Sequence, residues 1–153
     1  MSVCLFELSV DEVMPSLGNK ALNFNGITLN GNTPTLKMLR KKGTECVCCG
    51  KQGTHFRVMM DENSREPWRH ISLLLYTDDG SFLTRDHIIP KSNGGPNAMW
   101  NMQTMCNTCN LAKANTPPSI EQKIEVLLAM RKNGSKMTSK QRKWLKAAHD
   151  EIS

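Results

Sequence analysis

The chain has 153 residues, of which 39% are hydrophobic and only 5% aromatic, and it carries a net charge of +6. This size allows one domain, or a small core with extensions, and so lean a composition predicts that a bound metal helps to close the core. No apolar run is long enough to span a bilayer, and the first ten residues lack the basic start and apolar stretch of a signal peptide, so a membrane protein is excluded and a reducing, cytoplasmic compartment is expected.

The positive charge is concentrated toward the C-terminal end. Residues 1–45 carry five Lys or Arg against four Asp or Glu, residues 46–112 carry six against six, and residues 113–153 carry nine against four. A neutral centre with a basic appendage fits a module that acts on a polyanion held by the appendage. For any single lysine, a solvated helical face explains the charge equally well.

In chain order, the first 45 residues predict an extension with short elements. A strand (VCLFELSV) and a hairpin at an Asn-Gly turn are expected before Thr33. Thr33 then precedes a proline, which predicts the start of a short helix near residues 34–42, with basic residues in its last turn and Gly43 as its cap.

Two pairs of cysteines follow, Cys46/Cys49 and Cys106/Cys109, each with Cys-x-x-Cys spacing. Paired thiols of this kind suit one tetrahedral zinc ion better than disulfides. Cys48 offers a third thiol in the first loop, and we expect it to be a spare, buried one because it lacks the two-residue spacing. A redox Cys-x-x-Cys is the alternative, and it is weaker because no βαβ pattern surrounds the motif.

The centre of the chain predicts strands and one helix. HFRVMM (55–60) and HISLLLYT (70–77) read as strands, which we interpret as part of an insertion over residues 55–84. A further strand runs from Phe82 and is broken by Pro90. A loop, a short strand and a helix that starts at the second cysteine pair complete the order strand, loop, strand, helix.

Polar residues of this last segment form a recognisable set. Asp86 and His87 stand near the end of the predicted strand, a Gly-Gly loop follows, Asn101 precedes the next strand, and Asn110 comes directly after the second cysteine pair. A lone Asp-His pair means little, whereas the whole set in this order is specific. Residues 46–113 resemble the HNH endonuclease family, as an H-N-N variant, which implies a ββα-metal fold that cuts nucleic acid.

The resemblance also implies a role for each residue. His87 would be the general base, because an imidazole suits proton abstraction near neutral pH, and Asn101 would orient it. Asp86 and Asn110 would hold one divalent cation, Mg²⁺ or Mn²⁺, for which an amide oxygen is a suitable ligand. Lys113, one turn further along the helix, would either reach a phosphate or lie in solvent.

Residues 116–153 predict a basic tail of two amphipathic helices, each opened by a capping box. The polar side of the second helix carries four basic residues, Lys140, Arg142, Lys143 and Lys146. We interpret this basic face as nucleic-acid-binding, and it could instead extend a homodimer. The apolar stripes of both helices predict packing.

The predicted fold class is therefore α+β: a small zinc-stapled ββα-metal core over residues 46–115, an N-terminal extension over residues 1–45 and the basic helical tail. The predicted function is that of a metal-dependent DNA endonuclease. A non-catalytic, zinc-stabilised DNA-binding module is the alternative, and a redox or metal-storage protein with reactive cysteines is a third. Whether one strand or both are cut, and which DNA is the target, does not follow from these residues.

Overall fold

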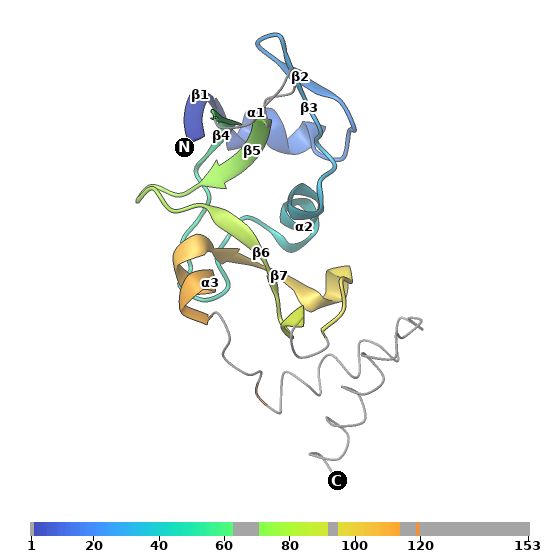
Figure 1. Cartoon of the computed structure of the whole chain (residues 1–153), viewed down its shortest axis with the longest axis vertical. Helices are drawn as coiled ribbons and strands as arrows, with labels where there is room; N and C mark the ends of the chain where they lie inside the picture. Colours follow the sequence, from blue (N-terminus) through green and yellow to red (C-terminus); the bar gives the residue numbers. More distant parts are fainter. Residues whose placement is uncertain (1, 63–70, 92–94, 114–118, 120–153) are drawn as a thin grey trace. The chain divides into compact units, whose positions relative to one another are not determined.

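The computed structural model describes four parts of the chain, residues 2–62, 71–91, 95–113 and 119 (Figure 1). Both predicted tail helices lie outside the described residues, and with them the four basic residues Lys140, Arg142, Lys143 and Lys146. The chain divides into a first unit, Met1–Arg85 with Thr104–Leu111, and a second unit, Asp86–Gln103 with Ala112–Ser153. Short strands and short helices alternate, so the fold is a small mixed α+β arrangement.

The first unit contains an antiparallel sheet of three strands in the order β1-β4-β5. Its strands are β1 (Ser2–Ser9), β4 (His55–Asp61) and β5 (Ile71–Tyr76), all expected from their β-branched and apolar residues. The sequence assigned β1 to the N-terminal extension and the other two strands to an insertion. Their pairing joins these two segments in one sheet, a long-range contact that no local pattern encodes.

The core of the first unit is built around β4. Phe56 and Val58, two residues apart on this strand, are fully buried, as the period of two in a strand requires. Phe56 pairs with Leu8 of β1 on one side and with Leu75 of β5 on the other, and both of these are buried as well. The helix α2 (Pro34–Lys42) adds three buried side chains, Leu36, Met38 and Leu39.

The predicted hairpin at an Asn-Gly turn is confirmed. Strands β2 (Leu22–Phe24) and β3 (Ile27–Leu29) pair antiparallel, and only Asn25 and Gly26 lie between them. Both turn residues have positive φ, 52° and 81°. That combination is the type I′ turn, which Asn-Gly favours because the pair tolerates a left-handed backbone and matches the twist of the strands.

The predicted short helix is confirmed as α2 (Pro34–Lys42). The Thr33 hydroxyl accepts a hydrogen bond from the Leu36 N–H at 3.3 Å, and Pro34 fills the first helical position, where no N–H partner is needed. The Gly43 N–H bonds to the Leu39 carbonyl and closes the last turn. Cap chemistry alone was therefore sufficient to place both ends.

The segment after β1 was predicted to stay extended to Val10, but it turns into a short helix, α1 (Val10–Val13), followed by a 3₁₀ turn, η1 (Met14–Ser16). Ser9 explains the change, since its hydroxyl accepts from the Glu12 N–H at 3.1 Å and caps the helix. No helix in the described parts of the chain is long and apolar enough to cross a membrane.

The last elements follow the predicted order of strand, loop, strand and helix. They are β6 (Leu83–His87), a 3₁₀ turn η3 (Met99–Asn101), β7 (Met102–Cys106) and α3 (Asn107–Lys113), with β6 and β7 forming a two-stranded sheet. β6 ends directly after the Asp-His pair. In the first unit, Phe82 and Asn107 exchange two hydrogen bonds, of 2.8 and 3.0 Å, and thereby tie the start of α3 to the residue before β6.

Candidate functional site

The four cysteines of the two Cys-x-x-Cys pairs come together in the first unit. The sulfur atoms of Cys46, Cys49, Cys106 and Cys109 all lie within 4.8 Å of one another. Cys46 and Cys106 are buried, whereas Cys49 is exposed. Four thiolates at one point are a donor set suited to a structural zinc ion, and the grouping is the one that the spacing predicts.

The backbone shapes the first cysteine loop. The Gly50 N–H donates to the Cys46 carbonyl at 3.0 Å and closes the turn. The Val47 N–H donates to the Thr104 carbonyl of β7 at 3.0 Å. Because Cys106 is the last residue of β7, the strand that holds the first cysteine loop in place also positions the first cysteine of the second pair.

Burial and hydrogen bonds shift the pKa values of two of the four thiols in opposite directions. Although burial alone would raise it, the pKa of Cys46 is lowered to about 6, because the backbone N–H groups of Cys49, Cys106 and Cys48 bond to its sulfur. A side-chain hydrogen bond with Cys106, together with burial, raises the pKa of Cys109. Crowded thiols thus share few negative charges until a metal replaces their protons, which is the usual coupling of zinc binding to deprotonation.

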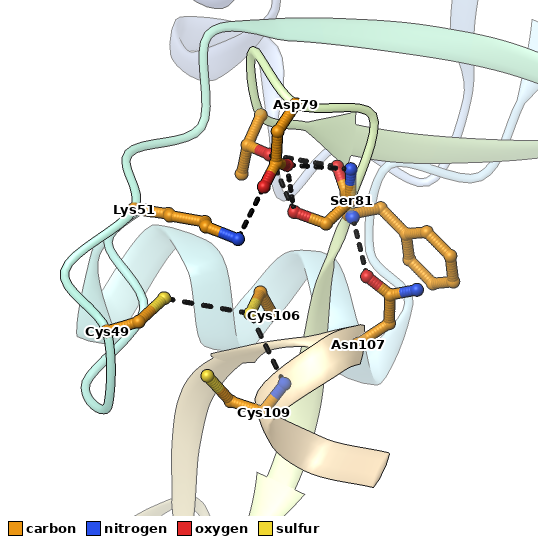
Figure 2. Close-up of polar contacts among 9 residues, drawn as sticks. Cys49, Lys51, Asp79, Ser81, Cys106, Asn107 and Cys109 are labelled. Carbon is orange, nitrogen blue, oxygen red and sulfur yellow. Dashed lines mark hydrogen bonds and ion pairs between the residues drawn. The ribbon is translucent and has the colours of Figure 1, made fainter. Parts of the chain in front are cut away.

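A charged pair stands beside the thiols. Figure 2 shows the Lys51 side chain extended toward Asp79, with Cys49 and Cys106 close by. The hydrogen bond to Asp79 raises the pKa of Lys51, and the negative charges of Cys49 and Cys106 add to the effect. The same bond, together with two from Ser81, lowers the pKa of Asp79. An ammonium at this place offsets the negative charge of a metal–thiolate group.

The prediction that Cys48 is a buried thiol is wrong. Cys48 is exposed and is not a member of the four-sulfur group. The reason is the turn itself, whose residues 47–50 are all exposed at the surface while the buried Cys46 points its sulfur inward. Spacing therefore identified the two thiols of this loop that join the four-sulfur group, but the third was assigned to the wrong environment.

In the second unit, Asp86 is almost fully buried, with 6% of its surface exposed. Its Oδ2 atom accepts hydrogen bonds from Lys113 Nζ at 2.6 Å and from Gln103 Nε2 at 2.9 Å. Lys113 also donates to the main-chain carbonyls of His87 and Ile88. This placement contradicts the alternative that Lys113 lies in solvent, since only 17% of its side chain is exposed. The phosphate contact of Lys113 stays a prediction.

His87 follows Asp86 on β6 and is half-buried. Adjacent strand residues project to opposite faces, which separates the imidazole from the buried carboxylate. Its Nε2 atom lies 2.7 Å from Oδ1 of Asn97, an exposed residue of the loop. Because an amide oxygen only accepts, this bond places a proton on Nε2 and leaves Nδ1 as the nitrogen that can take one.

Asn101 is fully buried, and its amide is used by the loop after His87. Its Oδ1 accepts from the Ile89 N–H at 3.0 Å, and its Nδ2 donates to the carbonyls of Ile89 at 3.1 Å and Pro96 at 2.9 Å. From the sequence, Asn101 was expected to orient the imidazole itself. In the structure Asn97 bonds to the ring, and Asn101 fixes the backbone at Ile89, two residues after His87.

Gly95, in the same loop, leaves no room for a side chain. A Cβ atom there would stand 1.8 Å from the Ile89 carbonyl oxygen and 3.0 Å from Asn101 Nδ2. The Gly95 N–H also donates to the Pro90 carbonyl at 3.0 Å. Glycine is needed here because the backbone approaches the strand end more closely than any side chain allows.

Asn110, the other predicted ligand of the catalytic cation, belongs to the first unit. Its amide nitrogen donates to the Thr84 hydroxyl at 2.8 Å, and that hydroxyl donates in turn to the Met105 carbonyl at 2.7 Å. This chain of bonds ties α3 to both strands of the small sheet. The amide oxygen of Asn110 is the atom that a hard cation would take.

Two residues of the site were missed from the sequence. Gln103 lies between buried Met102 and Thr104 on β7, and this alternation indicates that it leaves the core without showing that it meets Asp86. Asn97 belongs to a Gly-Gly-Pro-Asn loop, which has no periodicity. No pattern in the sequence could have linked Asn97 to His87.

These features define a small α+β module with four thiols that could hold a metal ion and an Asp-His pair at a strand end. Residues 77–125 match the family model described as HNH endonuclease, which confirms the resemblance over this segment of the chain. The matched segment includes the second cysteine pair and starts after the first. Neither a curated protein nor a solved structure matches the chain.

Proposed function

We propose that the protein is a metal-dependent DNA endonuclease that hydrolyses phosphodiester bonds. The family of the matched segment supports a nuclease. The observation that carries the proposal is the end of β6, where a buried carboxylate with two hydrogen-bond donors, Asp86, is followed by a half-exposed imidazole, His87, with one nitrogen bonded. A carboxylate and an imidazole held on opposite faces suit different tasks in one reaction, the carboxylate as a cation ligand and the imidazole as a base.

Hydrolysis of a phosphodiester needs an activated water, a cation at the phosphate and stabilisation of the departing oxygen. In our proposal His87 accepts the proton of the water at Nδ1, and Asn97 holds the ring through Nε2. Asn101 acts as a positioning residue, because it fixes the backbone directly after the base.

The donor chemistry fits two different metals. Asp86 and Asn110 offer a carboxylate and an amide oxygen, the ligands of Mg²⁺ or Mn²⁺, and we propose that they hold one such ion. When bound, this ion would supply positive charge at the scissile phosphate. Four thiols suit Zn²⁺, to which we assign a structural role in this protein.

The alternative, a zinc-stabilised module that binds DNA without cutting it, is favoured by one observation. Asp86 already has a cation partner in Lys113, so the carboxylate is neutralised without a metal. A module that only binds DNA needs no divalent cation at Asp86. A nuclease that uses Asp86 as a metal ligand must first break the ion pair between Asp86 and Lys113.

Cleavage of supercoiled plasmid distinguishes the two functions. The zinc-loaded protein with Mg²⁺ or Mn²⁺ should yield nicked or linear DNA, and the ratio of these forms reports one-strand or two-strand cutting. His87→Ala should lower the rate by about 10²- to 10⁴-fold, the usual effect of losing a general base, with DNA binding and zinc content unchanged.

Two controls make this test specific. His55→Ala removes a histidine of the sheet in the first unit and should cut like the wild type. Reactions without added Mg²⁺ or Mn²⁺ serve as the metal-free control. EDTA is not used for this purpose, because a chelator also removes zinc. Cleavage by His87→Ala at the wild-type rate would reject the assigned base, and wild-type protein that binds DNA without cutting it would favour the binding module.

We further propose that the basic tail holds the DNA. The support is its sequence alone, in which Lys140, Arg142, Lys143 and Lys146 share one side of a predicted helix. Each phosphate contact steepens the salt dependence of binding by about 0.9. Replacing all four by Gln should weaken binding and flatten the slope of log K against log salt by up to about 3.6. An unchanged slope would assign these charges to solubility.

A further inference from the structure

The ammonium group of Lys113 lies in a cage of oxygen atoms at the end of β6. Its Nζ is 2.6 Å from Asp86 Oδ2, 2.7 Å from the His87 carbonyl oxygen and 3.3 Å from the Ile88 carbonyl oxygen. Only 17% of the Lys113 side chain and 7% of the Asp86 side chain are exposed. A lysine at a helix end usually extends into solvent, so this placement needs a reason.

The cage has the composition of a cation site. An ammonium group has three N–H donors, and the three oxygens satisfy them. The same kinds of atoms, a carboxylate oxygen and main-chain carbonyl oxygens, are the ligands that hard divalent cations take in proteins. Gln103 donates to the same Oδ2 atom and keeps the carboxylate in position.

Two cations cannot share this carboxylate at low cost. Like charges a few ångströms apart repel, and the repulsion is stronger where water is largely excluded, as it is around Asp86. A divalent ion at Asp86 and the Lys113 ammonium at its present position are therefore competing states of one site.

We propose that Lys113 is the resident cation of Asp86 and must release it before a divalent cation can bind there. The inference rests on the proposed function only in taking Asp86 as a ligand of the catalytic ion. Lys113 thus sets the affinity of the protein for its catalytic metal, a role separate from the phosphate contact expected from its position on α3. Removing the ammonium should tighten divalent binding.

Binding of Mn²⁺ to the zinc-loaded full-length chain, followed by the EPR signal of the free ion, tests the proposal. Lys113→Met keeps an unbranched side chain without the charge. Lys91→Met is the matched control, since it removes one exposed lysine from the same unit. The dissociation constant should fall at least about tenfold for Lys113→Met and stay within about twofold of wild type for Lys91→Met. Equal affinity of the two variants would overturn the proposal.

A second measurement follows the lysine itself. The ¹⁵N–¹H signal of a caged, hydrogen-bonded ammonium is protected from exchange with water, and the Lys113→Met variant identifies it. Titration with Mg²⁺ should abolish this protection. The chemical shift of the His87 backbone amide, followed in the same titration, shows when the site is saturated. A Lys113 signal that stays protected at saturating Mg²⁺ would reject the exchange of one cation for the other.

Lys113→Met leaves Asp86 buried without its partner and could therefore fail to fold. Lys113→Gln then replaces it, because its amide still donates to the carboxylate. Mn²⁺ should raise the Tm of Lys113→Gln more than that of the wild type, and an equal rise would contradict the proposal. Tight Mn²⁺ binding by the variant together with no cleavage by the wild type would reject the nuclease alone. Cleavage by the wild type with unchanged Mn²⁺ affinity in the variant would reject the cation exchange alone.

Discussion

The two metal sites expected from this sequence are built on different principles. At the thiol group, four donors of one kind converge, and they have one another as neighbours. At Asp86, a single buried carboxylate is held by an amide and an ammonium from its own chain. The first arrangement offers four donors that could hold one metal ion, whereas the carboxylate of the second is already neutralised by Lys113. A structural metal site at the thiols would thus be specified by its donors alone, and the proposed cation site at Asp86 by partners that must be exchanged.

The strongest test of this contrast removes a thiol. Cys106→Ser should lose zinc and unfold the first unit, because apparent zinc-binding energies of about 10–16 kcal/mol equal or exceed the total stability of a small domain. Zinc analysis and thermal melting by circular dichroism report both effects. Cys48→Ser, which alters the exposed thiol of the first loop, should retain zinc and melt like the wild type. A Cys106→Ser protein of normal stability would remove the distinction between the sites.

A smaller effect is expected from the asparagines of the second unit. Asn101→Ala deletes three hydrogen bonds and leaves buried groups of Ile89 and Pro96 unpaired. The free energy of unfolding, measured with urea, should therefore fall by about 2–4 kcal/mol. Asn97→Ala removes an exposed side chain and should leave stability nearly unchanged while it slows cleavage. Equal destabilisation by the two substitutions would show that Asn97 is as structural as Asn101 and would contradict its assignment to the imidazole.

The mildest effect is expected beside the thiols. Lys51→Met removes the ammonium next to Cys49 and Cys106 and should speed the transfer of zinc to a chelator by up to about tenfold, toward the lower end of outer-shell effects. A rate of zinc transfer equal to that of the wild type would show that the Lys51 ammonium does not stabilise a metal held by the thiols.

Local signals in the sequence predicted local structure well. The turn at Asn25 and Gly26 and the cap at Thr33 depend on neighbouring residues, and both were placed correctly. The strand from Phe82 was predicted to run until Pro90, and it ends at His87 instead. The cysteine spacing identified the four converging sulfurs, since each short loop presents its first and last thiol together.

Long-range contacts were not predictable in this way. The pairing of β1 with β4 depends on which apolar strands meet, and many pairings would satisfy the same alternation. The contact of Lys113 with Asp86 joins residues 27 positions apart through a flexible side chain. Asn101 was expected to orient the imidazole, but Asn97 bonds to it, because both are loop-type asparagines and only burial distinguishes them.

The distance along the chain between the cysteine pairs has a consequence for synthesis. Cys46 and Cys49 leave the ribosome well before Cys109, which is 60 residues further on than Cys49. At about 5–20 residues per second, that interval lasts roughly 3–12 s. During this time the first loop presents three thiols, Cys48 among them, with no second pair to complete a tetrahedral site. The nascent chain therefore depends on its surroundings to keep those thiols reduced until translation delivers the rest of the site.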